Sequence, residues 1–212
     1  MPPRGPRART RRALLDAALK LLAQGVTPSV AEVAEAAEVS RATAYRYYPS
    51  QSALIAAVVD ESLGPILAWR STLKTAAGRI DDLLTSAYPR ILEHEVPLRA
   101  ALMLSLQQKA NAQRADGSVE PPLVRGHRKE TLRHTLEPLR ATLDAASVDR
   151  AAQALSLVYG TETLVVLKDI WGLDSAHATE VARWTAGAIV AQAERDARAA
   201  TKKAAAKPRK KS

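Results

Sequence analysis

Apolar residues recur every three or four positions through most of the chain, and this spacing restricts the fold more than any other feature. The spacing is typical of helices and leaves room for almost no β-sheet. The chain has 212 residues, 47% of them hydrophobic, which suffices for one domain or two small ones with a sizeable core. We therefore expect an all-α protein.

The basic residues are concentrated at the two ends of the chain. Residues 1–12 contain five arginines and residues 201–212 contain six lysines or arginines, and neither segment contains an acidic residue. These ends account for the net charge of +9, because the rest of the chain is slightly acidic. Positive segments without an apolar face are typical of nucleic-acid binding rather than membrane binding. Solvated tails that only aid solubility would have the same composition.

The sequence lacks the patterns of several classes of protein. The chain has no cysteine, and hence no disulfide framework and no thiolate chemistry. No segment resembles a signal peptide or reaches the roughly 20 apolar residues of a membrane span. The patterns of hydrolases and nucleotide-binding loops are missing, and a zinc-protease motif that begins at His94 has Leu98 in place of the second histidine. We expect a cytoplasmic protein that is not an enzyme and needs no cofactor.

Three helices are predicted near the N-terminus. The first spans about residues 10–24. Ser29 stands three residues before Glu32, which is the spacing of a capping box, so a second helix begins there. Residues 38–40 form a tight turn whose last residue can cap a third helix, and Pro49 ends that helix. The order is that of a helix-turn-helix.

In a helix-turn-helix, the second helix enters the major groove of DNA. Arginine side chains and the Thr43 methyl group suit contacts with base edges. The hydroxyls of Tyr45 and Tyr47 suit contacts with phosphates, whereas Tyr48 is expected to pack inward. A plain three-helix bundle with an aromatic core is the alternative, but two arginines beside two tyrosines make a poor core.

The same segment contains a series of residues at fixed spacing: Gly25, Val33, Ala34, Val39, Ser40, Thr43, Tyr45, Tyr47, Tyr48, Ser50 and Leu54. On this series, residues 10–55 resemble the N-terminal domain of the TetR family of bacterial transcriptional regulators. The resemblance covers under a quarter of the chain, and the total length and the helical remainder also agree with that family.

Two departures from the family pattern affect the expected site. Glu38 stands where the family has glycine, so a left-handed conformation there would cost about 1–2 kcal/mol. Gln51 stands where the family has a lysine directed at phosphate, and the basic N-terminal arm can supply the missing charge. The predicted DNA-binding residues are Ser29, Ser40, Arg41, Ala42, Thr43, Tyr45, Arg46, Tyr47, Gln51, Arg9 and Arg11.

The remainder of the chain is predicted to be helical near residues 51–76, 79–94, 97–111, 121–144, 147–171 and 175–200, with a polar loop at 111–122. We expect a basic disordered arm at 1–9, a helix-turn-helix DNA-binding domain at 10–55, a helical ligand-binding and dimerisation domain at 56–198, and a basic disordered tail at 199–212.

The last two predicted helices have broad apolar faces rich in small side chains, which suggests that a second copy of the chain covers them. The resemblance implies the same role for the two final helices, although an ordinary intramolecular core is the alternative. The predicted interface residues are Leu155, Val158, Val165, Val181, Trp184 and Ala188. A two-fold dimer would read a palindromic operator.

The resemblance also implies a small-molecule pocket in the larger domain. The candidates are polar and aromatic residues within its helices: Trp69, Tyr88, His94, Met103, Gln107, His127, Arg128, His134, Tyr159 and Glu162. His127, Glu130 and His134 share a helical face and could bind a metal, but a charged face of this kind is more often solvated, and we predict no metal site.

The sequence thus predicts a homodimeric transcriptional regulator, most simply a ligand-responsive repressor. Its expected partners are double-stranded operator DNA, a second copy of the chain and an unidentified small-molecule effector. The alternative is an architectural DNA-binding protein with little sequence specificity, which the lysine-rich C-terminal segment keeps open.

Overall fold

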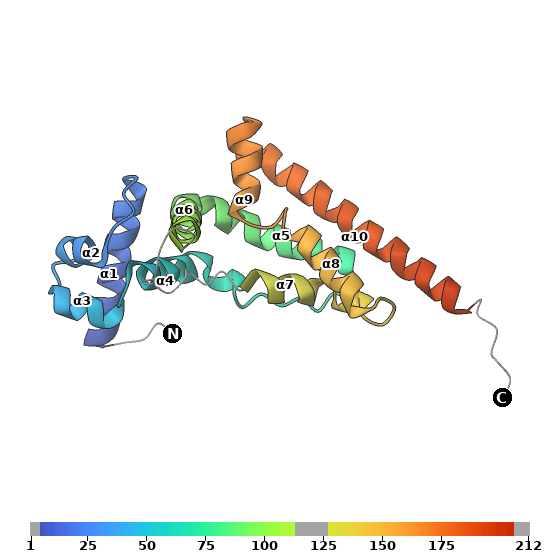
Figure 1. The fold of residues 1–212 in the computed structure, drawn as a ribbon, viewed down its shortest axis with the longest axis horizontal. Helices are drawn as coiled ribbons and strands as arrows, with labels where there is room; N and C mark the ends of the chain where they lie inside the picture. The colour runs from blue at the N-terminus through green and yellow to red at the C-terminus, as the bar shows by residue number, and fades with distance from the viewer. Residues whose placement is uncertain (1–4, 113–126, 206–212) are drawn as a thin grey trace. The chain divides into compact units, whose positions relative to one another are not determined.

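The computed structural model of the protein describes residues 5–112 and 127–205 (Figure 1). Within these ranges the regular structure is helical without any strand, so the all-α prediction is confirmed. The described residues form two compact units, 5–64 with 93–112 and 65–92 with 127–205. No helix of the described ranges is long and apolar enough to cross a membrane.

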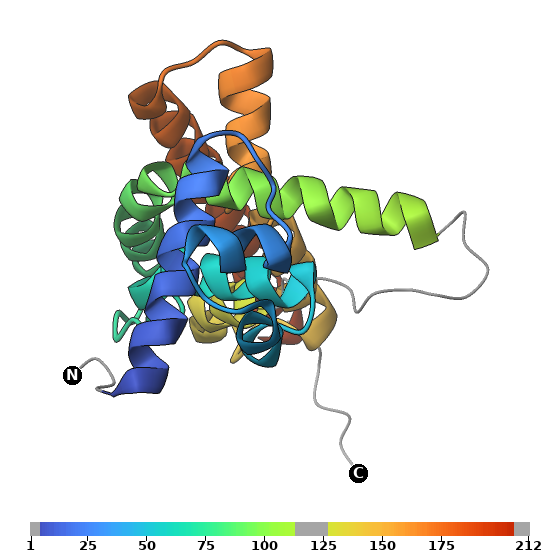
Figure 2. The ribbon, with the colours of Figure 1, turned by 90° about the vertical axis from the view of Figure 1, so that its left-hand side faces the viewer.

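The first unit contains α1 (Pro6–Ala23), α2 (Val30–Ala36), α3 (Arg41–Tyr47), α4 (Gln51–Leu63) and α6 (Glu95–Ala112). Helix α2 lies against both α1 and α3, as Figures 1 and 2 show. One apolar core joins these helices: Leu14, Leu15 and Ala18 of α1, Val30, Val33 and Ala34 of α2, Ala44 of α3, Leu54, Ile55 and Val58 of α4, and Ala101 and Leu104 of α6. The participation of α6 extends this unit beyond the predicted domain of residues 10–55.

The predicted N-terminal caps are confirmed. The Glu32 backbone N–H donates to the Ser29 hydroxyl oxygen at 3.2 Å, and the Ser29 backbone N–H donates to the Glu32 carboxylate at 2.7 Å. The bond from the Ser29 backbone lowers the pKa of Glu32. Ser40 caps α3 in the same way, through a 3.2 Å bond from the Thr43 backbone N–H. These bonds fix where α2 and α3 begin.

The turn between α2 and α3 has the expected left-handed residue, because Glu38 adopts a φ of 54°. Replacing Glu38 by glycine is therefore expected to raise the free energy of unfolding by about 0.5–1 kcal/mol, since the relieved strain exceeds the extra chain entropy of glycine. Urea unfolding of both proteins measures the change. The matched control is Glu35→Gly inside α2, which should lower stability by about the same amount. A loss of stability in Glu38→Gly would contradict the strain.

Helix α4 ends much earlier than predicted. The predicted helix of residues 51–76 stops at Leu63, and a short 3-10 turn, Gly64–Ile66, follows. Gly64 adopts a φ of 40°, which favours glycine, and Pro65 cannot donate a helical hydrogen bond. The pair therefore stops the helix.

The second unit contains nearly all of α5 (Ala76–Glu93), together with α7 (His127–Thr135), α8 (Ala145–Leu155), α9 (Thr161–Leu164), a π-helical segment (Val165–Ile170) and α10 (Ser175–Ala205). Helix α8 packs against α7 and α10. The Tyr88 side chain is fully buried, and its hydroxyl donates to the Val158 carbonyl oxygen at 2.9 Å. This bond ties α5 to the segment after α8.

Two predicted helices of this unit are wrong in extent. The helix expected at 121–144 is α7 alone in its described part, followed by a 3-10 turn at Glu137–Leu139 that contains Pro138. The helix expected at 147–171 is interrupted at residues 156–160, where Gly160 adopts a φ of 138°. Helix α8 ends at Leu155, and Gly160, whose φ favours glycine, is the N-terminal cap residue of α9. The predicted loop at 111–122 lies mostly outside the described residues.

The predicted ends of the chain also differ from the structure. Helix α1 begins at Pro6, inside the predicted arm, because proline is well tolerated in a first helical turn. Helix α10 continues to Ala205, inside the predicted tail. Alanine and lysine, which fill its last turns, are good helix formers.

Candidate functional site

Helix α3 has one buried side and one exposed side. Ala44 is fully buried and Tyr48, directly after the helix, is 5% exposed, which confirms that Tyr48 packs inward. The predicted base-reading residues Arg41, Ala42 and Arg46 are exposed, as is Tyr45. A short capped helix thus presents two guanidinium groups and a phenol on one accessible surface.

The hydroxyls of Ser40 and Thr43 hold the start of α3. The Ser40 hydroxyl donates to the Thr43 hydroxyl oxygen at 2.9 Å while its own oxygen accepts the capping bond. Thr43 is half-buried. Ser40 therefore positions α3, and Thr43 lies at the border of the exposed side.

The end of α3 is attached to the start of α1. The Tyr47 hydroxyl donates to the Arg7 carbonyl oxygen at 3.2 Å. Arg7, Arg9 and Arg11 are exposed on α1. Burial raises the pKa of Tyr48, and the charge of nearby Arg11 opposes that rise. The start of α1, with its exposed arginines, is thus attached to the end of α3. Arg9 and Arg11 were predicted to bind DNA, and Arg7 is a further candidate.

Two further predicted residues have structural partners. The Gln51 side-chain amide donates to the carbonyl oxygens of Thr27 and Pro28, at 3.3 and 3.1 Å, and so ties α4 to the loop before α2. The Ser29 hydroxyl is occupied by its cap. Both side chains support the helix-turn-helix from within.

The effector candidates are not gathered in one place. Met103 and Gln107 are exposed on α6 in the first unit. In the second unit the rings of Trp69 and His134 lie 5.8 Å apart, and the Trp69 indole donates to Asp82 at 3.1 Å.

The two tyrosine candidates of the second unit are buried. Tyr88 is fully enclosed and Tyr159 is 7% exposed. Burial raises the pKa of each to about 12, so both stay neutral at ordinary pH. The side chain of His127 lies outside the described residues, and the described ones contain no cluster of histidine or acidic residues that could hold a metal.

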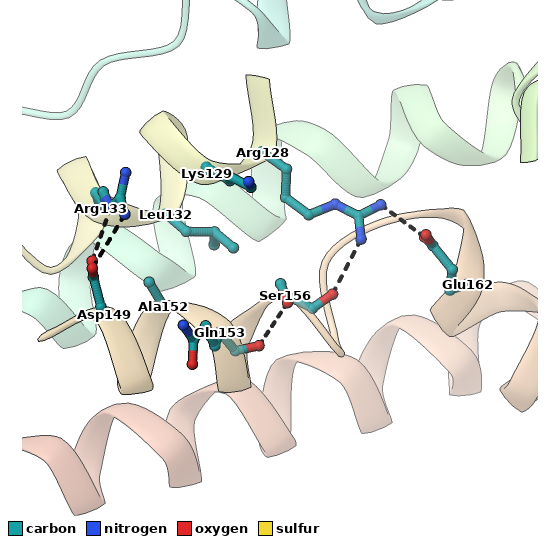
Figure 3. Close-up of a pocket in the computed structure, with 9 residues that line it drawn as sticks. All are labelled: Arg128, Lys129, Leu132, Arg133, Asp149, Ala152, Gln153, Ser156 and Glu162. Carbon is teal, nitrogen blue, oxygen red and sulfur yellow. Dashed lines mark hydrogen bonds and ion pairs between the residues drawn. The ribbon is translucent and has the colours of Figure 1, made fainter. Parts of the chain in front are cut away.

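A cleft of about 350 Å³ lies in the second unit beside α7, α8 and the start of α9 (Figure 3). It is lined by Arg128, Lys129, Leu132, Arg133, Asp149, Ala152, Gln153, Ser156 and Glu162. The Arg128 guanidinium donates to Glu162 at 2.7 Å and to the Ser156 carbonyl oxygen at 3.3 Å. Arg133 bonds both carboxylate oxygens of Asp149, at 2.9 and 3.2 Å.

Gly160 makes room for the Arg128 bridge. A Cβ atom at Gly160 would lie 2.2 Å from the Arg128 Nη2 atom, which is too close for any real contact. Arg128 thus reaches from α7 to α9 over a residue that has no side chain. The sequence shows a glycine there, but only the fold reveals what passes over it.

An exposed apolar surface runs along the π-helical segment and α10. It includes Val166, Ile170, Trp171, Val181 and Trp184, of which Ile170, Trp171 and Trp184 are more than 70% exposed. Of the predicted interface residues, Val181, Trp184 and Ala188 are exposed, and Val158 and Val165 are half-buried. Leu155 is fully buried within the chain, so its side chain is not available to a second copy.

An all-helical chain whose capped helices α2 and α3 enclose a tight turn is a helix-turn-helix protein. Residues 14–58 match the sequence model of the bacterial regulatory proteins of the tetR family. This match confirms the resemblance to the TetR family noted from the N-terminal residues.

A curated relative carries the same segment. The HTH-type transcriptional repressor LfrR of Mycolicibacterium smegmatis is 48% identical over 54 residues, which are 26% of this chain. The match spans only 29% of the length of that relative. The likeness therefore concerns the helix-turn-helix segment.

Solved structures share the fold over most of the chain. A TetR-family transcriptional regulator from Streptomyces coelicolor has a TM-score of 0.63 at 19% identity and covers 95% of this chain and 91% of its own. A TetR transcriptional regulator from Rhodococcus sp. RHA1 has a TM-score of 0.56 at 14% identity and covers 87% of this chain and 97% of its own. At these identities the likeness establishes the fold.

Proposed function

We propose that the protein is a sequence-specific transcriptional regulator that binds operator DNA through α3. The observation that carries the proposal is the exposed side of α3, which presents Arg41, Ala42, Tyr45 and Arg46, while Ala44 is buried on the other side. Arginine can bond guanine through two parallel N–H groups, which suits base reading in the major groove. The relative named as a repressor shares this segment, so repression is the favoured outcome. Such a regulator acts on the chromosome in the cytoplasm.

The basic start of α1 supplies the non-specific part of the contact. Arg7, Arg9 and Arg11 carry three positive charges close to the end of α3, and phosphate contacts of this kind set affinity and register rather than sequence choice. Arg12 differs, because it pairs with Asp16 at 3.0 Å and with Glu61 at 3.1 Å.

The working form is proposed to be a homodimer. Three large apolar side chains that are more than 70% exposed, with valines beside them, form a surface that a second copy would cover. A two-fold axis would then present two copies of α3 to a palindromic operator, with half-sites about one DNA turn apart or a multiple of it.

The regulator is proposed to respond to a small molecule bound in the second unit. The cleft lined by Arg128 and Glu162 is the candidate site, since it combines charged groups with an apolar floor. A ligand that binds the form with low DNA affinity more tightly would release the operator.

Selection from random DNA duplexes at physiological salt tests the proposal. We expect one palindromic motif, bound more tightly than random DNA by about 4–10 kcal/mol. The architectural alternative predicts no motif and binding that vanishes as salt rises. That result would overturn the proposed function. A protein with alanine at both Arg41 and Arg46 is the matched control and should select no motif.

A further inference from the structure

We propose that the cleft beside α7 and α8 binds a small organic monoanion, a single carboxylate attached to a compact apolar body. The regulatory meaning of this site rests on the proposed function, but the binding does not. The inference follows from the charges that line the cleft, from its floor and from its size.

Four of the five charged residues of the cleft neutralise one another. Arg128 pairs with Glu162 on one side, and Arg133 pairs with Asp149 on the other. The Arg133 guanidinium lowers the pKa of Asp149, so that carboxylate stays ionised at neutral pH. The two pairs form two walls of the cleft, and within each pair the opposite charges compensate each other (Figure 3).

Lys129 is the fifth charged residue, and the lining residues that the structure describes carry a net charge of +1. It is exposed on α7, and it forms no ion pair with any residue of the described ranges. Gln153 on α8 also lines the cleft and is exposed, so its amide can donate a hydrogen bond to the same anion. The cleft therefore has one ammonium group and one amide donor available to a ligand.

The floor of the cleft is apolar. Leu132 is 1% exposed and Ala152 is 8% exposed, and both line the cleft. A ligand that only carried charge would leave this floor without contacts. A volume of about 350 Å³ is at the lower end for ligand pockets, which fits an apolar body about as large as one aromatic ring.

The two carboxylates of the walls limit the charge of the ligand. Asp149 and Glu162 lie on either side of the space that the ligand would fill, and a second negative charge on the ligand would be repelled by them. One negative charge matches the net charge of the lining. A monoanion is thus favoured over both a neutral analogue and a dianion.

The test uses the full chain with benzoate as the probe, and ligand-observed NMR titration measures binding. We expect benzoate to bind about tenfold or more tightly than benzamide, which has the same shape without the charge, and also more tightly than phthalate or inorganic phosphate. Lys129→Gln should weaken benzoate about tenfold. Gln153→Glu, which removes the net positive charge, should weaken it at least as much.

The matched control is Lys109→Gln, which removes one exposed lysine of the first unit and should leave benzoate binding unchanged. Any of three results would overturn the proposal. The first is that benzoate binds no more tightly than benzamide, and the second is that it binds no more tightly than inorganic phosphate. The third is that Lys129→Gln binds benzoate as tightly as the unchanged protein does. Thermal unfolding of each variant verifies that it is folded.

A second measurement separates this site from the proposed function. Benzoate binding is read without DNA, so its failure leaves the operator selection intact. If no motif is selected while benzoate binds as expected, the proposed function fails and the carboxylate site stands. A change of operator affinity with benzoate that Lys129→Gln abolishes would support both.

Discussion

Replacing Trp184 by glutamate is expected to convert the protein to a monomer and to abolish tight operator binding. Trp184 is 75% exposed in the single chain and lies on the side of α10 opposite the buried residues Ala182 and Ala186. A two-fold interface would contain this position twice, so two unpaired carboxylates would be buried. We expect the dimer dissociation constant to rise at least about 100-fold, measured by analytical ultracentrifugation.

The control for this variant is Trp184→Phe, which keeps an aromatic side chain and should remain dimeric. Operator binding by the glutamate variant should fall with the loss of the dimer, because one recognition helix contacts only one half-site. A glutamate variant that stays dimeric would place the interface elsewhere. A monomeric variant with full operator affinity would contradict the palindromic operator.

The second large effect is expected from replacing the two exposed arginines of α3, the proposed recognition helix. The double variant with alanine at Arg41 and Arg46 is expected to lose about 100-fold or more in operator affinity, since each specific base contact contributes about 1–3 kcal/mol. Its stability should be nearly unchanged, because both side chains are exposed. Fluorescence anisotropy with operator and with random DNA measures the effect.

The salt dependence identifies what the two arginines contact. Arginines that read bases should lower the affinity for operator far more than for random DNA, whereas arginines that bind phosphates should lower both and reduce the salt slope by about 0.9 per contact. The matched control replaces Arg140 and Arg195, two exposed arginines of the second unit, by alanine. A loss as large in this control would show that net charge alone controls binding.

The starts of α2 and α3 could be predicted because their signals are local. Ser29 and Glu32 lie three residues apart, and Ser40 and Thr43 likewise, so each cap depends only on neighbouring residues. The left-handed conformation of Glu38 could be predicted because the family pattern has glycine at this position. Such features need no knowledge of distant parts of the chain.

Helix ends in the second half were harder to predict, although some had signals in the sequence. Gly64 and Pro65 together are a common helix stop, and this pair would have corrected the predicted helix of residues 51–76. Gly160 inside an apolar run marked the interruption before α9 in the same way. Apolar residues continued to recur at helical spacing across both positions, so periodicity alone predicted one uninterrupted helix at each of them.

The partners of the side chains could not be predicted from periodicity. Arg128 and Glu162 meet across 34 positions of sequence, and the contact depends on how α7 and α9 pack. Leu155 is a second residue whose partners could not be predicted from periodicity. Periodicity placed it on an apolar face, but it did not tell whether that face is covered by the chain itself or by a second copy.

The place of α6 in the core of the first unit has a consequence for protein engineering. Ala101 and Leu104 are buried in the same core as Leu14 and Leu54, although some 40 residues or more separate them in sequence. Residues 1–64 alone would leave part of this core facing water. The helix-turn-helix is therefore not a portable module: a chimera that transplants it onto another protein must also bring α6, or supply a helix that covers the same surface.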